Sequence, residues 1–208
     1  MGAGLAVNDK VNREYLKRVN EHQLDKQRVA EDTQGRAERK LARFKKGKRP
    51  PQVPRKPTLI EPNLWLGNFY DALQRHDFKY IVNCTTVAYD LDGVQLSFMN
   101  IEDDESENIG SHLPRQTTWI SGCIQAGGSV LVHCEHGVSR SATVIIAYIM
   151  KERSMTAIDA LQHVRNLRPC VCPNENFLEA LCDWERACGI KVNRRGSSLK
   201  QLKSVFSY

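Results

Sequence analysis

The sequence contains no long apolar run, and this absence excludes one class of protein. A helix that crosses a bilayer needs about 18–20 consecutive apolar residues, and no segment of these 208 residues approaches that length. The basic, apolar and small-residue regions of a secretory signal are also missing from the N-terminal segment. We therefore expect no membrane span and no export, and we predict a protein of the cytoplasm, the nucleus or both.

Paired metal-binding cysteines are missing too, although the chain has seven cysteines. Structural zinc sites draw on two closely spaced pairs of Cys or His, whereas Cys170-Val171-Cys172 has no second pair. An odd number of cysteines without a secretory signal indicates reduced thiols and not a disulfide framework. The sequence therefore predicts no metal site and leaves its thiols available for chemistry.

Acidic residues do not balance the many Lys and Arg at the two ends of the chain, so the net charge of +6 is unevenly distributed. Residues 1–56 carry 16 Lys and Arg against 7 Asp and Glu, whereas residues 57–208 carry 14 against 17. We predict a basic helical extension that ends in a proline-rich linker (1–57). The last residues (190–208) contain no acid and are predicted to form a basic, flexible tail.

The end of this extension leaves several partners open. Residues 45–57 contain four prolines and six basic residues. Such a run is typical of a solubilising linker, a nuclear localisation signal, an RNA or acidic-lipid patch, or a docking segment for a protein kinase. We therefore expect nucleic acid or an acidic membrane surface, if either binds, to contact residues 40–56. Acylation of Gly2 is disfavoured, because Ala6 stands where the myristoylation pattern has Ser or Thr.

Strand-like and helix-like segments alternate through the rest of the chain. This alternation predicts the α/β class, with a central, mostly parallel twisted sheet flanked by helices on both faces. The expected strands lie near residues 64–66, 80–85, 95–101 and 129–133, and the expected helices near 69–76, 113–126, 140–152, 156–167 and 175–188.

One short run carries most of the functional information: His133-Cys134-Glu135-His136-Gly137-Val138-Ser139-Arg140-Ser141. It follows a buried-strand pattern and precedes a buried-helix pattern, so Cys134 should end a strand in a loop that opens a helix. Backbone N–H groups and the positive helix end converge in such a loop, which suits a phosphate dianion and stabilises a thiolate. Gly137 allows the tight turn, and Arg140 can hold phosphate through its planar, bidentate guanidinium.

This run resembles the His-Cys-x-x-Gly-x-x-Arg-Ser/Thr signature of the cysteine-based protein phosphatases, and its ending is most similar to the dual-specificity branch. Three other segments are similar to that branch: residues 59–68, 80–85 and 168–178. The resemblance covers residues 58–189, which we predict to be the catalytic domain. It implies the family's α/β fold, no cofactor, and the small atypical type, since the extension holds no upstream kinase-binding domain.

The resemblance also implies roles for the residues of the signature. Cys134 would form a cysteinyl-phosphate intermediate, Arg140 would bind the phosphate oxygens, and Ser141 would stabilise the departing thiolate. His133 is expected either to tune Cys134 or to be a packed core histidine. The other loop residues would line the phosphate pocket: Glu135, His136, Gly137, Val138 and Ser139.

Residues outside the signature complete the implied site. The family's general acid is an aspartate about 30 residues before the cysteine, and its pattern has an apolar residue six positions after the acid. Ile109 satisfies this spacing for Asp103, and Asp104 is the alternative. Some members have a cysteine on the strand behind the site, so Cys84 is either a partner for oxidised Cys134 or a small core residue. Asn174 is expected to cap a helix or to brace the loop from behind.

The sequence therefore predicts a phosphatase that hydrolyses phosphotyrosine and phosphoserine/threonine in proteins. One alternative is the same chemistry on a phosphoinositide or an RNA 5′ end. Relatives of those kinds usually have Lys or Arg between the cysteine and the arginine of the loop, or an Asn-Arg-Thr ending, and this loop has neither. The other alternative is an inactive phosphate-binding scaffold, which the presence of the cysteine, the arginine and the acid disfavours.

Overall fold

Five short strands form one sheet in the computed structural model, which describes residues 53–74, 77–190 and 197–206. In the order β1-β2-β5-β3-β4, the strands are Thr58–Glu61, Leu64–Asn68, Val130–Cys134, Tyr80–Asn83 and Gln95–Phe98. Only the edge pair β1–β2 is antiparallel, and the other three pairs are parallel. The predicted mostly parallel sheet is confirmed.

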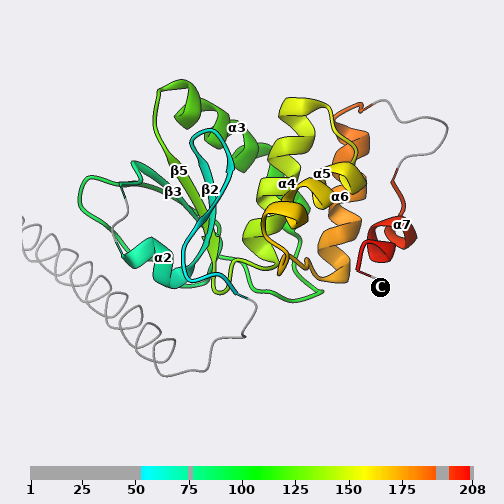
Figure 1. Ribbon diagram of the computed structural model, residues 1–208, viewed down its shortest axis with the longest axis horizontal. Helices are drawn as coiled ribbons and strands as arrows, with labels where there is room; N and C mark the ends of the chain where they lie inside the picture. Colours follow the sequence, from blue (N-terminus) through cyan, green and yellow to red (C-terminus); the bar gives the residue numbers. More distant parts are fainter. Residues whose placement is uncertain (1–52, 75–76, 191–196, 207–208) are drawn as a thin grey trace, which may run out of the picture.

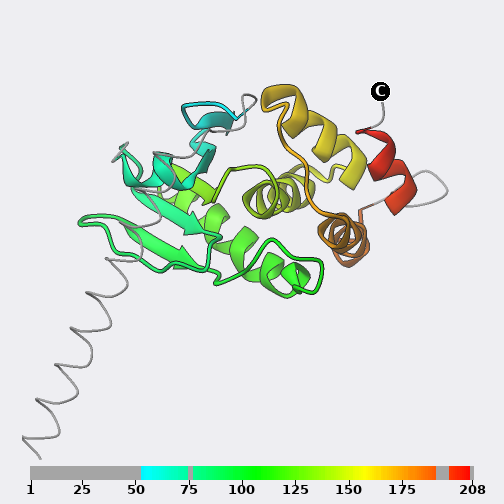
Figure 2. The same cartoon turned by 90° about the horizontal axis from the view of Figure 1, so that it is seen from below.

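Helices cover both faces of this sheet unequally (Figure 1). The larger core lies against α3 (Leu113–Gln125), α4 (Arg140–Arg153), α5 (Ala157–Leu167) and α6 (Glu175–Ala187), with the 3₁₀ turn η1 (Ile109–His112) leading into α3. The short α2 (Phe69–Leu73) lies on the opposite face, over a smaller apolar cluster. Figure 2 shows α4 between the sheet and the outer helices α5 and α6.

The central strand β5 determines where the signature lies. All five of its residues are buried. Because side chains alternate along a strand, Val130 and Val132 enter the larger core while Leu131 enters the smaller one. Cys134 is the last residue of β5, so the loop that follows lies at the carboxyl end of the parallel strands, where α/β sheets bind ligands.

Side-chain caps explain where several helices begin. Asn68 and Asp71 form a reciprocal capping box at the start of α2. Thr156 and Asn174 each accept a backbone N–H of the next helix, so α5 and α6 begin directly after them. Two strands are shorter than predicted: β3 ends at Asn83 and not at residue 85, and β4 ends at Phe98, although the predicted pattern continued to Ile101. Beyond β4, the Met99 N–H still donates to the Asn83 carbonyl at 3.0 Å. Met99 and Ile101 are buried on either side of the exposed Asn100, so this segment imitates a strand.

Both ends of the chain differ from expectation where the structure describes them. Residues 190–208 were predicted to be a flexible tail, but Leu199–Ser204 form a helix, α7, whose Leu202 is fully buried. Val53, assigned to the linker, is buried as well. Residues 1–52, with Gly2 and most of the 40–56 segment, lie outside the described residues, as do 191–196. Within the described ranges, no helix combines the length and apolar character that crossing a membrane requires.

Candidate active site

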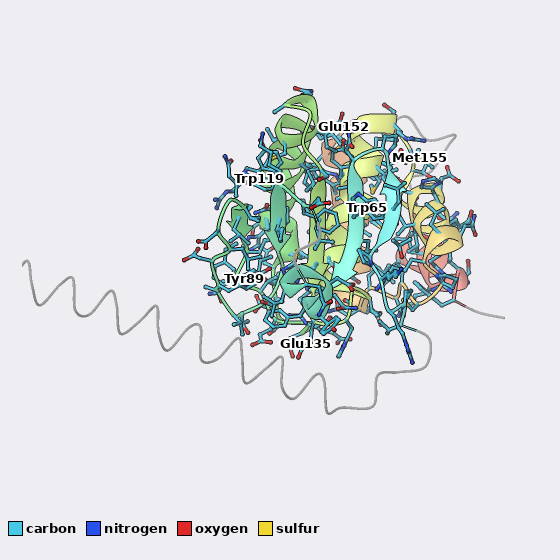
Figure 3. All side chains as sticks on the ribbon, turned by 60° about the vertical axis from the view of Figure 1, so that its left-hand side comes forward. Trp65, Tyr89, Trp119, Glu135, Glu152 and Met155 are labelled. Carbon is cyan, nitrogen blue, oxygen red and sulfur yellow. The ribbon has the colours of Figure 1, made fainter. Side chains whose placement is uncertain are left out.

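The loop between Cys134 and α4 lies at one end of the molecule. Figure 3 shows Glu135 of this loop at the opposite end from Glu152 and Met155, which lie at and beyond the far end of α4. Gly137 has the positive φ of 68° that the tight turn was expected to need. A Cβ there would also collide with the carbonyl oxygen of Gly67 and lie 2.8 Å from a guanidinium nitrogen of Arg168. Only glycine fits this position.

The Cys134 thiol is almost fully buried, yet its surroundings favour the thiolate. Its Sγ accepts hydrogen bonds from the Gly137 N–H at 3.2 Å and from the Ser141 hydroxyl at 3.1 Å. Burial alone raises the pKa of the thiol. The charge of Arg140 and the hydrogen bonds from the loop and Ser141 lower it by more than burial raises it, so the pKa lies below its ordinary value. Cys134 is therefore prepared as a nucleophile.

Arg140 is the buried cation of the site. It is 4% exposed, and its Nη1 donates to the Ile101 carbonyl at 3.1 Å. Carboxylates of Asp103 and Glu135 lie 3.7 and 3.8 Å from its other nitrogens. The Nε–H has no hydrogen-bond partner among the described residues, although it is buried. Buried donors are rarely left unsatisfied, so this N–H is available for an anion above Cys134.

The acidic segment that follows Ile101 approaches the loop through Asp103 and not through Asp104. The Asp103 Oδ1 accepts from the Ser139 hydroxyl at 2.8 Å and from the Asn174 side-chain amide at 3.0 Å, and its Oδ2 is the oxygen near Arg140. The Asp104 carboxylate instead binds the backbone and hydroxyl of Ser106. Both hydrogen bonds lower the pKa of Asp104, and the one from the hydroxyl has the larger effect. Of the two aspartates, the geometry favours Asp103.

Asn174 caps a helix, as expected, but its side-chain amide holds Asp103 and does not brace the phosphate loop from behind. Its side-chain oxygen caps α6 by accepting the Phe177 N–H at 2.9 Å, while its amide group holds Asp103. Its own N–H also donates to the Ser139 hydroxyl at 3.3 Å. Ser139 thus joins the phosphate loop, the aspartate segment and α6, although the sequence suggested only that it lines the pocket.

Arg168 braces the loop from behind, a role that sequence reasoning did not assign to it. This fully buried side chain donates to the Gly137 carbonyl at 2.9 Å, to the His136 carbonyl at 3.3 Å and to the Thr58 hydroxyl at 3.0 Å. Burial lowers the pKa of its guanidinium, but from a value so high that the charge remains. The signal that could have identified Arg168 is its place at the start of the Arg-Pro segment that resembles the family.

His133 lies beneath the loop in an aromatic environment. Its Nε2 shares a hydrogen bond with the Tyr89 hydroxyl, and its Nδ1 lies 3.3 Å from the Cys134 carbonyl oxygen. The rings of Phe69 and Tyr89 pack against it, 6.0 and 5.8 Å from its centroid. His133 is thus both packed in the core and hydrogen-bonded to the backbone of the nucleophile. Tyr89 was not singled out from the sequence, because it follows a strand with no motif around it.

A cavity of about 470 Å³ opens above these groups. Cys134, Arg140 and Asp103 all contribute to its lining, as do the predicted loop residues His136, Val138 and Ser139. Its outer wall adds residues that were not expected there: Val53, Cys170, Cys172 and Pro173. A thiol with a lowered pKa, an available guanidinium N–H and a carboxylate thus converge on one pocket. Together with the α/β sheet, they define a cysteine-based phosphatase.

Comparisons with known proteins identify the family. The family described as dual specificity phosphatase, catalytic domain, matches residues 64–187. Dual specificity protein phosphatase 1 of Arabidopsis thaliana is 36% identical over 138 residues, which cover 63% of this chain and 70% of the plant protein. Human dual specificity protein phosphatase 16 is 38% identical over 156 residues, which cover 70% of this chain but 24% of the human protein. The crystal structure of human DUSP28 superposes with a TM-score of 0.62 at 30% identity, covering 68% of this chain and 99% of DUSP28.

The chain therefore belongs to the dual specificity phosphatase family, and it is a cysteine-based protein phosphatase. The resemblance stated from the signature is confirmed, and so is the small atypical type.

Removing the Ser141 hydroxyl should shift the reactivity of Cys134 to higher pH. The hydroxyl donates to Sγ and so favours the thiolate; without it the pKa of Cys134 rises, and the thiol stays protonated to a higher pH. A hydrogen bond to a charged group is worth about 1.5–3 kcal/mol, or about one to two pKa units. We expect Ser141→Ala to move the midpoint of iodoacetate inactivation upward by about one pH unit. The control is Thr143→Ala, since the Thr143 hydroxyl bonds only the Ser139 carbonyl. An unchanged midpoint in Ser141→Ala would contradict this role.

Proposed function

We propose that this protein hydrolyses phosphotyrosine and phosphoserine/threonine in proteins through a cysteinyl-phosphate intermediate. The single observation that carries the proposal is the Cys134 thiolate beneath the unsatisfied Nε–H of Arg140. The loop amides and Arg140 hold three oxygens of the phosphate, and Cys134 attacks phosphorus in line with the leaving oxygen. These hydrogen-bond donors are already in position to stabilise the charge that develops on the oxygens in the transition state.

Asp103 supplies the proton that the leaving alkoxide or phenoxide needs. Ser139 and Asn174 hold its Oδ1, so Oδ2, on the Arg140 side, carries the proton. After the dephosphorylated product departs, the same carboxylate activates the water that attacks the cysteinyl phosphate. The Ser141 hydroxyl stabilises the thiolate as it leaves phosphorus.

The two neighbouring aspartates provide a matched test of the acid. We expect Asp103→Asn to lower kcat on phosphoserine and phosphothreonine peptides by about 10²–10³-fold, because their alkoxides cannot leave unprotonated. The loss should be much smaller for an aryl phosphate with a low-pKa leaving group. Asp104→Asn should stay near the wild-type rate on both substrates. If Asp104→Asn were the impaired variant, the assignment of the acid would be off by one residue.

Phosphate release from a peptide that carries both phosphothreonine and phosphotyrosine tests the function itself. In reductant and without metal, we expect loss of both phosphates, and no release by Cys134→Ser. Release from a phosphoinositide or an RNA 5′ phosphate, with none from the peptide, would reassign the substrate class. Binding of the peptide without any release would identify a scaffold.

The end of the basic extension lies at the mouth of this pocket. Val53 lines the cavity, whereas Arg55 and Lys56, just after it, are exposed. We propose that a phosphorylated protein contacts this segment while its phosphate occupies the pocket, and that a protein kinase is one such partner. Binding of nucleic acid or an acidic membrane by residues 40–56 stays a prediction, as does a location in the cytoplasm or nucleus.

The surroundings of Cys84 support a redox role for this cysteine. It directly follows β3, and its N–H donates to the His133 carbonyl at 2.9 Å, next to Cys134. Burial, and then the charge of Cys134, raise the pKa of the Cys84 thiol, whereas the pKa of Cys134 is lowered, so Cys134 ionises before Cys84. We propose that peroxide converts the Cys134 thiolate to a sulfenic acid. The Cys84 sulfur then attacks the sulfenic sulfur, the sulfenic hydroxyl leaves with the thiol proton as water, and a disulfide forms.

Dilute hydrogen peroxide distinguishes this redox role from that of a core residue. We expect a Cys84–Cys134 disulfide in the peptide map and full recovery of activity with dithiothreitol. In Cys84→Ser, Cys134 should instead proceed to the irreversible sulfinic acid. Equal recovery in both proteins would leave Cys84 as a core residue.

A further inference from the structure

The helix α7 is held against α5 and α6 by contacts along its length. Leu202 belongs to the larger core and is fully buried. Lys203 forms an ion pair with Glu175 in the first turn of α6, and the Arg165 guanidinium of α5 lies over the Phe206 ring at 4.5 Å. Arg165 in turn donates to the Val171 carbonyl, in the segment whose Cys170 and Cys172 line the active-site pocket. The docked tail therefore supports helices that adjoin the active site.

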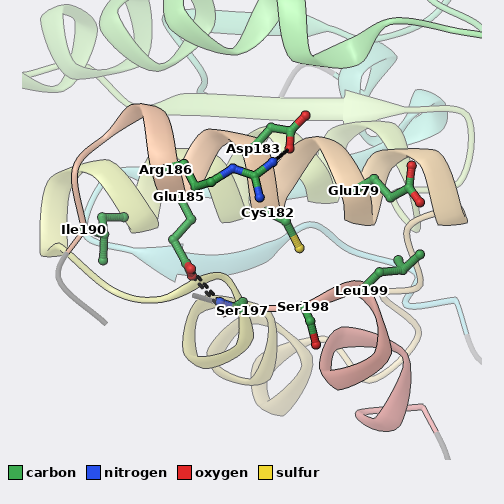
Figure 4. Close-up of a pocket in the computed structure, with 9 residues that line it drawn as sticks. All are labelled: Glu179, Cys182, Asp183, Glu185, Arg186, Ile190, Ser197, Ser198 and Leu199. Carbon is green, nitrogen blue, oxygen red and sulfur yellow. Dashed lines mark hydrogen bonds and ion pairs between the residues drawn. The ribbon is translucent and has the colours of Figure 1, made fainter. Parts of the chain in front are cut away.

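Ser197 fixes the start of this tail to a buried carboxylate (Figure 4). Its N–H and its hydroxyl donate to the two oxygens of Glu185 at 2.6 and 2.7 Å. Glu185 is 1% exposed and also accepts the Ala157 N–H at the start of α5, at 2.6 Å. The Ser197 hydroxyl accepts the Ile158 N–H at 3.3 Å. One serine side chain thus connects the tail to both α5 and α6.

The sequence around Ser197 has the pattern of a phosphoacceptor. Arg194 and Arg195 precede it by three and two residues, and they lie outside the described residues. Protein kinases with acidic substrate grooves select serines that follow such a basic pair. The catalytic function assigned above uses neither this motif nor Glu185.

We propose that Ser197 is a phosphorylation site for an arginine-directed serine kinase, and that its phosphate releases α7 from α5 and α6. ATP is the phosphoryl donor. The bond between the γ-phosphorus and the bridging oxygen of ATP breaks, the bond from Ser197 Oγ to phosphorus forms, and ADP and the hydroxyl proton leave.

The docked tail cannot accommodate a phosphate on Ser197. Phosphorylation removes the proton that the hydroxyl donates to Glu185 and adds a charge of about −1.5 to −2 next to a buried carboxylate. Like charges at this separation repel strongly where water is excluded. Because the docked state holds the hydroxyl against Glu185, the kinase acts on the fraction of molecules with α7 undocked, and the phosphate then retains that state.

Ser198 is a matched control one residue away. It is exposed, and its hydroxyl bonds only to Gln201 in the capping box of α7. A phosphate there has nearly the same charge and sequence context but faces solvent and no buried carboxylate. Modification of Ser198 should therefore leave α7 docked.

Cys182 provides a native reporter of docking. It is 7% exposed and lines a cavity of about 560 Å³ between α6 and the tail, together with Ser197, Ser198 and Leu199. Burial, followed by the charge of Glu185, raises the pKa of its thiol to about 11. Undocking α7 exposes this thiol to water and so accelerates its alkylation.

The test uses the full chain with phosphoserine incorporated at position 197 or 198, and the unmodified chain. Native alkylation by iodoacetamide is followed at Cys182 by peptide mass spectrometry. We expect phosphate at 197 to raise the Cys182 rate by about tenfold or more, and phosphate at 198 to change it less than about twofold. Equal Cys182 rates in the two phosphoproteins would overturn the proposal. Equal acceleration at Cys123, on the distant helix α3, would indicate global unfolding and would also overturn it.

Kinase treatment tests the site directly. Incubation of the unmodified chain with an arginine-directed serine kinase and ATP should place phosphate on Ser197, and Ser197→Ala should lose that modification. A phosphate found only on Ser198, or none on either serine, would refute the assignment.

Discussion

Replacing Cys134 with serine should abolish turnover while phosphopeptide binding persists. The thiolate is the only nucleophile that the proposed chemistry has, and a serine hydroxyl does not ionise near neutral pH. Loss of a covalent nucleophile lowers kcat by about 10⁴-fold or more. Serine is slightly smaller than cysteine and keeps a group that the Gly137 N–H can bind, so the loop should retain its shape. Without the thiolate charge, the phosphate dianion should bind at least as tightly as in the wild type.

Three measurements check this expectation. Steady-state assays give the loss in kcat, calorimetry with a phosphotyrosine peptide gives the binding constant, and rapid acid quench with labelled substrate traps the cysteinyl phosphate in the wild type alone. Cys123→Ser is the matched control, since Cys123 is also buried but lies on α3. Residual turnover by Cys134→Ser above about 1% of the wild type would exclude Cys134 as the nucleophile.

The local context of the signature was predictable because each part of it has a local cause. An apolar strand, a glycine and an apolar helix follow one another within 21 residues, from 130 to 150. The parallel pairing of β5 with two strands then directs the loop to the carboxyl end of the sheet. The helix starts at 156–157 and 174–175 were near their predicted positions because Thr156 and Asn174 cap them through short-range hydrogen bonds.

Long-range contacts were not predictable in this way. Arg168 reaches Gly137 across 31 positions, Tyr89 reaches His133 across 44, and Ser197 reaches Glu185 across 12. Each of these side chains acts through a hydrogen bond that only the folded chain brings about, so no periodicity marks it. The tail was interpreted as flexible for the same reason. Residues 190–208 contain five Lys and Arg and no acid, and nothing in this composition marks Leu202 as the residue that is buried.

Arg140→Lys should lower kcat/KM by about 10²–10³-fold without destabilising the fold. Lysine keeps the positive charge that lowers the pKa of Cys134, but it lacks the planar fork that binds two phosphate oxygens at once. In the unliganded protein the Arg140 Nε–H is buried without a partner among the described residues, so its removal costs no hydrogen bond. The bond from Nη1 to the Ile101 carbonyl is at risk, whereas the charge that faces Asp103 and Glu135 is kept. The substitution should therefore lower kcat/KM for a phosphorylated substrate and leave the free energy of unfolding unchanged.

The matched substitution Arg168→Lys should show the opposite behaviour. Arg168 makes three hydrogen bonds within the protein, two of them to carbonyls of the phosphate loop. Lysine cannot span all three, and leaving such buried groups unpaired costs about 2–4 kcal/mol. Urea unfolding and kcat/KM measured on both variants separate the two roles. A large loss of stability in Arg140→Lys, or a stable but inactive Arg168→Lys, would show that the roles of binding phosphate and supporting the loop are assigned to the wrong arginines. With the order as expected, Arg140 holds the substrate and Arg168 holds the loop that binds it.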